Sequence, residues 1–93
     1  MQDLNIIFYK NDVIEEKLDE QTFIIPIKDG LADMNNICAI GKVASFIWQK
    51  ITGNNRIKDI IDSVINKYDV DFEVAKNDVL EFLFLLKKEN LIR

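Results

Sequence analysis

Residues 72–89 read FEVAKNDVLEFLFLLKKE, and the rest of the chain must pack around this segment. Its apolar residues recur at helical spacing and form one stripe, made of Val79, Phe82, Leu83 and Leu86. Asp71 stands directly before the stretch and is a good N-cap residue. The pattern therefore predicts a long amphipathic helix whose stripe faces a hydrophobic core.

This stretch carries more apolar surface than one face of a helix needs. Leu80 and Phe84 fall on one flank of the stripe and Leu85 falls on the other, so the apolar arc is much wider than about 100°. Two explanations are open. Either the sheet and the other helices sandwich the helix, or a hydrophobic groove runs beside it.

Two shorter helices are expected before residue 72. The first has apolar residues at helical spacing over residues 43–51, and Gly53 marks its end. Trp48 shares this spacing and is expected in the core. The second helix covers residues 57–68 and has the cleanest stripe in the chain, with Asn55 as its expected cap.

The preceding residues predict strands, because short β-branched runs replace the helical period. The expected strands contain the stretch Val13–Ile14 before Leu18, then Thr22–Ile27, and then Ile37–Ile40. Residues 28–30 provide a turn, and residues 35–36, both Asn, are expected to form a two-residue hairpin loop between residues 31–34 and 37–40. Pro26 has no N–H to donate, so its nitrogen must face an edge, a bulge or the end of the pairing.

These elements predict an α+β protein, in which a three-stranded antiparallel β-meander is followed by three α-helices. Its length of 93 residues and its 48% hydrophobic content fit a single domain over residues 1–93. Residues 1–11 precede the first expected strand and are read as an arm or a weak strand, because Ile6 and Phe8 are spaced two residues apart, as on one face of a strand.

Composition excludes several classes of function. The chain has no histidine and one cysteine, so catalysis by the chain, a metal site and a cofactor are all unexpected. Its net charge of −4 has the wrong sign for binding nucleic acid. No apolar run approaches the roughly 20 residues of a membrane span, so no membrane partner is expected. A lone Cys38, read as an inert buried thiol, favours a reducing compartment and a cytoplasmic protein.

Several segments resemble one family of small proteins. The segments that carry the resemblance are Phe23–Ile27, Ala32–Asn35, Ile40–Trp48, Tyr68–Asp71, Asp78–Val79, Phe82–Leu83, Leu86 and Leu91–Ile92. Together they are similar to the PqqD-like peptide chaperones, also called RiPP recognition elements, over about residues 13–93. Two positions depart from the family pattern: Gly41 replaces a capping residue before the first helix, and Arg56 stands where Thr or Ser usually opens the second.

The resemblance implies a winged helix-turn-helix-like fold without catalytic activity. It also implies that the leader segment of a ribosomally made precursor peptide docks as an extra strand on the third strand, beside the third helix. A modifying enzyme would receive the peptide, most often a radical S-adenosylmethionine enzyme, with cyclodehydratases and lasso-peptide proteases as other partners in the family.

The expected binding residues come from the two walls of this groove. The last strand would be an edge with unpaired backbone groups, contributed by Asn36, Ile37, Cys38, Ala39 and Ile40. The third helix would contribute Lys76, Leu80, Leu83, Phe84 and Lys87. Lysines along the rim would favour acidic leader residues.

Two other classes of function compete with this interpretation. A winged-helix DNA-binding regulator needs a basic, polar reading helix, whereas residues 72–89 carry Asp78, Glu81 and Glu89 among Leu and Phe. An enzyme subunit ranks last, because no nucleophile with a base and no phosphate loop is present. A homodimer through the surplus apolar surface of the third helix is the alternative use of that surface.

Overall fold

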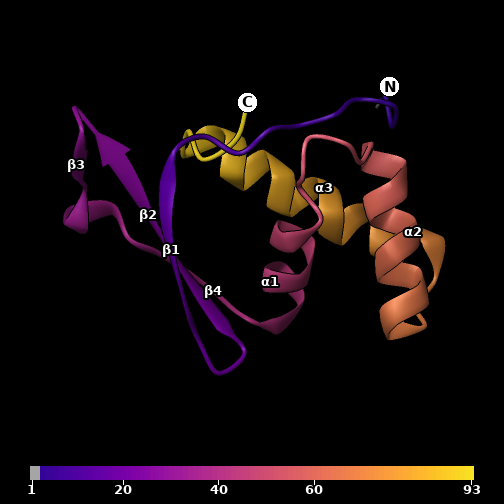
Figure 1. Cartoon of the computed structure of the whole chain (residues 1–93). Coiled ribbons are helices and arrows are strands. Elements are labelled where there is room, and N and C mark those ends of the chain that lie inside the picture. Colours follow the sequence, from indigo (N-terminus) through magenta and orange to yellow (C-terminus); the bar gives the residue numbers. More distant parts are fainter. Residues whose placement is uncertain (1–2) are drawn as a thin grey trace.

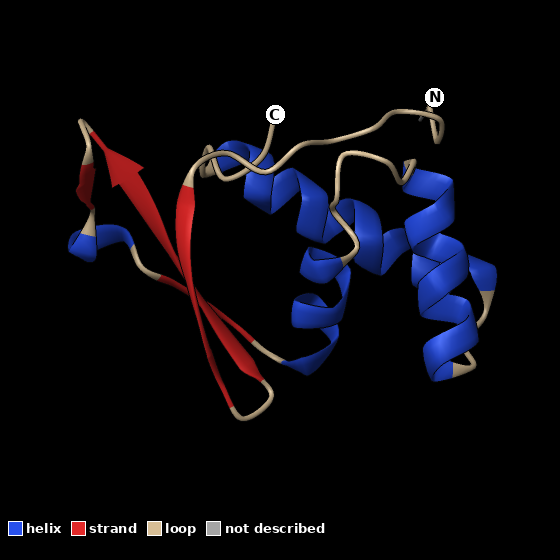
Figure 2. Ribbon diagram, viewed as in Figure 1, coloured by secondary structure: helices blue, strands red, loops and turns tan. Residues whose placement is uncertain are grey.

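The computed structural model describes residues 3–93, in which a small sheet is followed by three helices (Figure 1). The strands are β1 (Val13–Leu18), β2 (Gln21–Lys28), β3 (Leu31–Ala32) and β4 (Cys38–Ile40). The helices are α1 (Lys42–Gln49), α2 (Ile57–Tyr68) and α3 (Phe72–Lys88). Figure 2 shows the strands on one side of the molecule and the three α-helices on the other. The expected α+β architecture is confirmed.

β2 is the central strand of the sheet. It pairs with β1 along its length, from Leu18 opposite Gln21 to Val13 opposite Pro26. The turns at the two ends of β2 contain residues in the left-handed conformation. Asp19 lies in the turn before β2 and has φ 57°, and Asp29 and Gly30 lie in the turn after it and have φ 55° and 78°. Such conformations match the right-handed twist of tight hairpins. The turn expected at residues 28–30 is therefore confirmed.

The expected hairpin loop at residues 35–36 is wrong. Residues 34–36 form a single 3-10 turn, and β4 pairs with β2 rather than with the residues before the turn. Because β3 also pairs with β2, the third strand of the meander is one edge strand broken in the middle. We call β3, the 3-10 turn and β4 together the broken third strand.

Pro26 explains where the third strand breaks. On β2, Ile27 and the residue after it pair with β3, whereas Ile24 and the two residues before it pair with β4. Pro26 lies in the gap between these two paired segments. Its carbonyl accepts a hydrogen bond from Asp33 N–H (2.7 Å), but its nitrogen has no proton to donate to the same edge. The Asp33 side chain then accepts from Asn35 N–H and caps the 3-10 turn that fills the gap. Pro26 thus faces a bulge, one of the three placements its sequence allowed.

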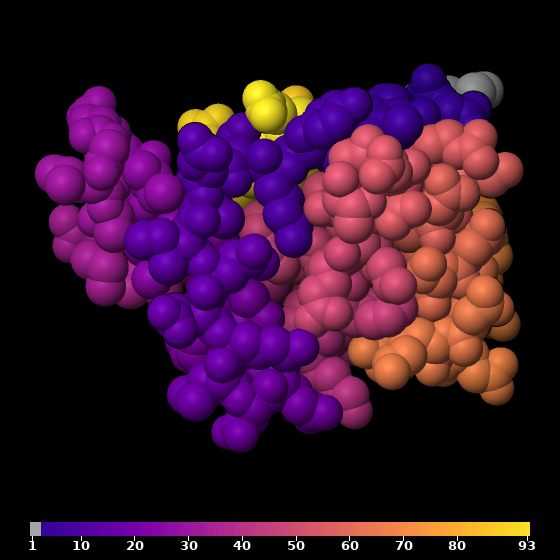
Figure 3. Space-filling model, viewed as in Figure 1, coloured from indigo at the N-terminus to yellow at the C-terminus, as the bar shows by residue number. Residues whose placement is uncertain are grey.

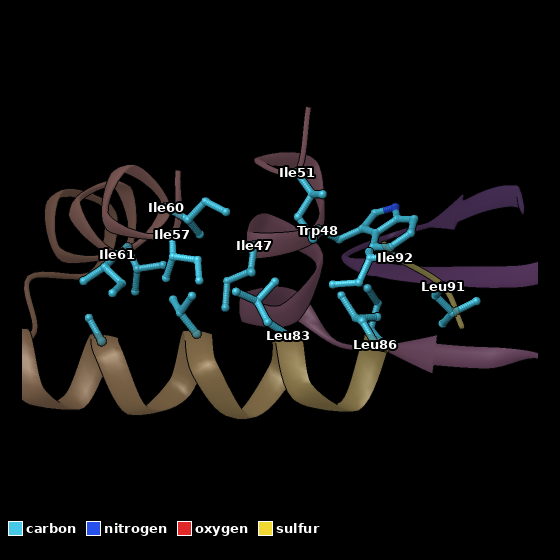
Figure 4. Close-up of a cluster of buried hydrophobic side chains, with 14 of the residues drawn as sticks. Ile47, Trp48, Ile51, Ile57, Ile60, Ile61, Leu83, Leu86, Leu91 and Ile92 are labelled. Atoms are coloured by element: carbon cyan, nitrogen blue, oxygen red, sulfur yellow. The ribbon is translucent and has the colours of Figure 1, made fainter. Parts of the chain in front are cut away.

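The core is built around the inner stripe of α3. Ala75, Val79, Leu83 and Leu86 are buried there. Figure 4 shows Leu83 and Leu86 pointing from α3 toward side chains of the other two helices and of the C-terminal residues. Trp48 is 1% exposed, which confirms its expected place in the core. Its indole N–H donates to the Glu15 carboxylate, so the one polar group of this ring is satisfied at the edge of the core.

The start of α2 is capped by the Asp59 carboxylate and by carbonyls of the preceding chain, whereas the Asn55 side chain bonds to the Lys50 carbonyl, so the expectation that Asn55 caps this helix is wrong. Arg56 is the N-cap residue, and its N–H donates to the Asp59 carboxylate (2.8 Å). Residues 3–12, which we call the N-terminal arm, supply further acceptors: the carbonyls of Ile6 and Leu4 accept from Ile57 N–H and Lys58 N–H (3.0 and 2.9 Å). These bonds satisfy donors that every helix leaves free in its first turn.

The N-terminal arm makes isolated bridges and is not part of the sheet. Residues 1 and 2 of the expected arm lie outside the described part of the chain. Within residues 3–93, no helix combines the length and the apolar character needed to cross a membrane.

Two substitutions in α3 test the position of the core. Leu86 is 0% exposed and Phe84 is 73% exposed. Leu86→Ala is expected to lower the free energy of unfolding by about 2–5 kcal/mol, because it leaves a cavity in the core. Phe84→Ala is the control and is expected to cost less than about 1 kcal/mol. Urea unfolding measures both, and equal losses would contradict the assignment of the inner stripe.

Candidate functional site

The outer edge of β4 carries backbone groups that face away from the sheet. Successive residues of an antiparallel strand alternate between facing the neighbouring strand and facing away. The Pro26 carbonyl points toward the broken third strand, so Thr22 and Ile24, on the same side of β2, also face it and pair with Ile40 and Cys38. Ala39 lies between those two residues. Its N–H and C=O therefore point outward, where no strand within residues 3–93 pairs with them.

A groove of about 870 Å3 lies beside this edge, between the broken third strand and the C-terminal end of α3. Its walls come from four parts of the chain: the N-terminal arm, the end of β2, the broken third strand, and the end of α3 with the residues after it. The lining residues are Asn11, Asp12, Pro26, Ile27, Lys28, Asp33, Asn35, Asn36, Ile37, Cys38, Leu85, Lys88, Glu89, Asn90 and Leu91.

The five expected residues of the last strand lie at or next to this groove. Asn36, Ile37 and Cys38 line it. Ala39 is exposed and contributes the outward backbone groups described above. Ile40 is 6% exposed, so its side chain belongs to the core. Three of the five side chains and one backbone position are thus available to a ligand.

The expected residues of α3 do not line the groove. Leu83 is buried in the core, and Leu80 packs half-buried against it. Phe84 is exposed outside the groove, Lys76 pairs with Glu73 (3.6 Å), and Lys87 lies over the Phe8 ring of the N-terminal arm (5.5 Å). The groove instead uses the opposite flank of α3, where Leu85, Lys88 and Glu89 lie.

Several groove residues were absent from the sequence prediction. Asn11 and Asp12 come from the arm, Lys28 is the last residue of β2, and Asp33 directly follows β3. No periodicity marks such positions, because they belong to loops and strand ends. The one sequence feature that pointed to this flank of α3 was Leu85, an apolar residue that lies outside the core stripe.

The groove carries charges of both signs. Its carboxylates come from Asp12, Asp33 and Glu89, and its ammonium groups from Lys28 and Lys88. This mixture differs from the lysine rim expected from the sequence, since carboxylates outnumber lysines along the walls. The electrostatics of the groove therefore give no preference for an acidic ligand.

Cys38 is half-buried in the groove wall, near the end of α3. Burial raises the pKa of its thiol above the ordinary value of 9.0, and the Glu89 carboxylate raises the pKa further. A thiol that stays protonated at neutral pH is a poor nucleophile. Cys38 therefore contributes a small apolar surface to the wall of the groove.

The arrangement can hold an extended peptide. The outward N–H and C=O of Ala39 provide a donor and an acceptor for another strand, and Ile37 and Leu85 provide apolar surface on the two walls. Side chains of a strand alternate between two faces, so one row of a docked strand would enter the groove.

Comparison with known proteins gives two matches. The family model described as "Coenzyme PQQ synthesis protein D (PqqD)" matches residues 18–92. The structure "TbiB1 in Complex with the TbiA(beta) Leader Peptide" superposes with a TM-score of 0.78, covering 91% of this chain and 94% of that one at 22% identity. At that identity the likeness concerns the fold. No protein with a curated description matches the chain.

The thiol of Cys38 offers a test of the groove's electrostatics. Because its pKa lies above 9.0, the alkylation rate is expected to keep rising with pH beyond pH 9. Glu89→Gln removes a negative charge, so it should lower the pKa and speed alkylation at a fixed pH. Glu81→Gln, about 12 Å earlier along the same helix, is the matched control. Iodoacetamide labelling followed by mass spectrometry measures the rates, and a rate that levels off near pH 7 would contradict the environment described.

Proposed function

Because the chain belongs to the PqqD family, we propose that it binds the leader segment of a ribosomally synthesised precursor peptide and presents that peptide to a modifying enzyme. The observation that carries the proposal is the open edge of β4 beside the groove. TbiB1, a structure of the same fold, is bound to a leader peptide, which supports this reading of the edge.

The proposed binding mode is strand addition. An extended leader would pair with the outward N–H and C=O of Ala39, and the sheet would gain one strand at β4. β4 spans three residues, so its ladder offers few backbone hydrogen bonds. A leader that is disordered when free also loses conformational entropy on docking. Side chains of the leader that enter the groove must therefore supply much of the affinity.

The groove favours apolar leader side chains flanked by polar ones. Ile37 and Leu85 are 42% and 43% exposed, so each has apolar surface that a ligand would cover. Carboxylates and lysines surround them at the rim. Charged leader residues would find partners of either sign there, which affects the rate of association more than the affinity.

The alternative of a DNA-binding regulator is not supported. In that class the exposed face of the reading helix is basic and polar. The exposed positions of α3 mix acidic, apolar and basic side chains, such as Glu81, Phe84 and Lys88, rather than forming a basic face. The family match and the structural match both point to the peptide-binding class instead.

The proposal includes a division of labour between this chain and its enzyme. The chain would contribute affinity for the leader, with no catalysis of its own, and the enzyme would carry out the modification. The proposed partner is a radical S-adenosylmethionine enzyme, and the transfer of the peptide to it would occur in the cytoplasm. The raised pKa of the Cys38 thiol supports the non-catalytic role, because the one cysteine of the chain is not activated.

A homodimer through the exposed surface around Phe84 stays a prediction, which light scattering of the purified chain tests.

Removal of the outward N–H at residue 39 tests strand addition. Ala39→Pro deletes this donor but keeps the pairing of Cys38 and Ile40 with β2, and proline is tolerated where its nitrogen faces an open edge. The variant is expected to bind the leader about 10-fold more weakly, since it loses one hydrogen bond and places a ring in the ligand's path. Isothermal titration calorimetry with a synthetic leader of the cognate precursor peptide measures the change.

Ala39→Ser is the matched control, because it changes the same exposed side chain and keeps the N–H. It should bind the leader as the original chain does. Equal affinity for Ala39→Pro and Ala39→Ser would contradict strand addition at β4, and no binding of the leader to the original chain would overturn the proposed function itself.

A further inference from the structure

The N-terminal arm is fastened to the C-terminal residues by backbone hydrogen bonds. Tyr9 and Arg93 exchange two such bonds, each 2.8 Å, and Asn11 N–H donates to the Leu91 carbonyl (3.0 Å). Figure 3 shows the arm lying over the top of the molecule, against the C-terminal residues at one end and the start of α2 at the other. The arm therefore connects two distant parts of the helical layer.

Side chains of the arm also pack into the fold. Leu4 and Phe8 contact the core cluster, and Lys10 lies over the Trp48 ring (4.4 Å). The Tyr9 ring packs so closely on Gly53 that a Cβ there would come within 3.0 Å of it, and Gly53 has φ 84°. An arm with this many contacts has a defined position, which fixes the direction in which the chain enters β1.

The last residues of the arm form a wall of the groove. Asn11 and Asp12 line it together with Asn90 and Leu91, which follow α3. The Asn11 side chain donates from Nδ2 to the Asn90 carbonyl (2.7 Å). Asn90 has φ 60°, the left-handed conformation with which the chain turns away from the end of α3. This contact joins the two chain segments that close one end of the groove.

We infer that the N-terminal arm is a working part of the ligand groove, and that Asn11 is a positioning residue for the leader. The inference rests on the proposed function and concerns how its groove is built. Asn11 acts through Asn90 and Leu91, because it holds these residues at the groove wall.

The arm and the leader should stabilise one another. If the docked arm gives the groove its binding shape, leader binding must strengthen the docking of the arm by the same free energy. The effect should reach the start of α2, because the carbonyls of Ile6 and Leu4 accept from the amides of Ile57 and Lys58. A residue with a purely structural role would change stability equally in the free and bound states.

The first test compares two asparagines of the arm. Asn11→Ala removes the bond to Asn90, whereas Asn5→Ala is the control, because within residues 3–93 Asn5 donates through its backbone N–H to Asp3. Calorimetry with the synthetic leader should show a Kd about 3- to 10-fold higher for Asn11→Ala and unchanged for Asn5→Ala. A Kd unchanged in Asn11→Ala, with a lower free energy of unfolding, would mean a structural role and would overturn the inference.

The second test needs no variant. In the original chain, hydrogen exchange at the amides of Tyr9, Asn11 and Arg93 should slow when the leader binds, by more than exchange in the outer strand β1. If the leader binds but these amides exchange at the same rate, the inference fails and the proposed function stands. If the leader does not bind the original chain, the proposed function fails first.

Discussion

Burial of the inner stripe of α3 is the constraint on which the rest of the structure depends. Val79, Leu83 and Leu86 need cover along most of the helix, and α1, α2, the sheet and the C-terminal residues provide it together. With the stripe fixed inward, the rotation of the helix is fixed as well. The flank with Leu85 and Glu89 then faces the groove beside the broken third strand, while Phe84 points to solvent. The position of one groove wall thus follows from core packing.

A second constraint, Pro26, forms the other wall. Because Pro26 has no N–H, the pairing between β2 and the third strand is interrupted for a few residues. The 3-10 turn capped by Asp33 occupies the gap. A continuous third strand would leave a flat edge along its whole length. The break instead produces a short edge at β4 next to a hollow lined by Pro26 and Ile37. Strand addition and side-chain insertion are therefore available at neighbouring positions, which suits capture of an extended peptide.

The sequence allowed the three helices, the hairpin turn at residues 28–30 and the buried position of Trp48 to be predicted, because each follows from a local period or a local residue preference. Prediction failed where long-range pairing decided the outcome. Asn35 and Asn36 have the right chemistry for a hairpin, but Pro26, on the neighbouring strand, determines that a bulge forms there. The flank of α3 that lines the groove also depends on its neighbours: Leu80 and Leu85 both lie beside the core stripe, and only packing distinguishes them. Asn11 and Asp12 carry no pattern at all.

In the proposed complex the outward backbone of β4 receives an extended peptide. NMR of the isotope-labelled chain mixed with the synthetic, unlabelled leader detects this pairing. Intermolecular NOEs are expected between leader backbone protons and the Ala39 amide, and the Ala39 resonance is expected to shift as its N–H gains an acceptor. Contacts confined to α2 or to the outer edge of β1, with the Ala39 amide unshifted in the saturated complex, would contradict it.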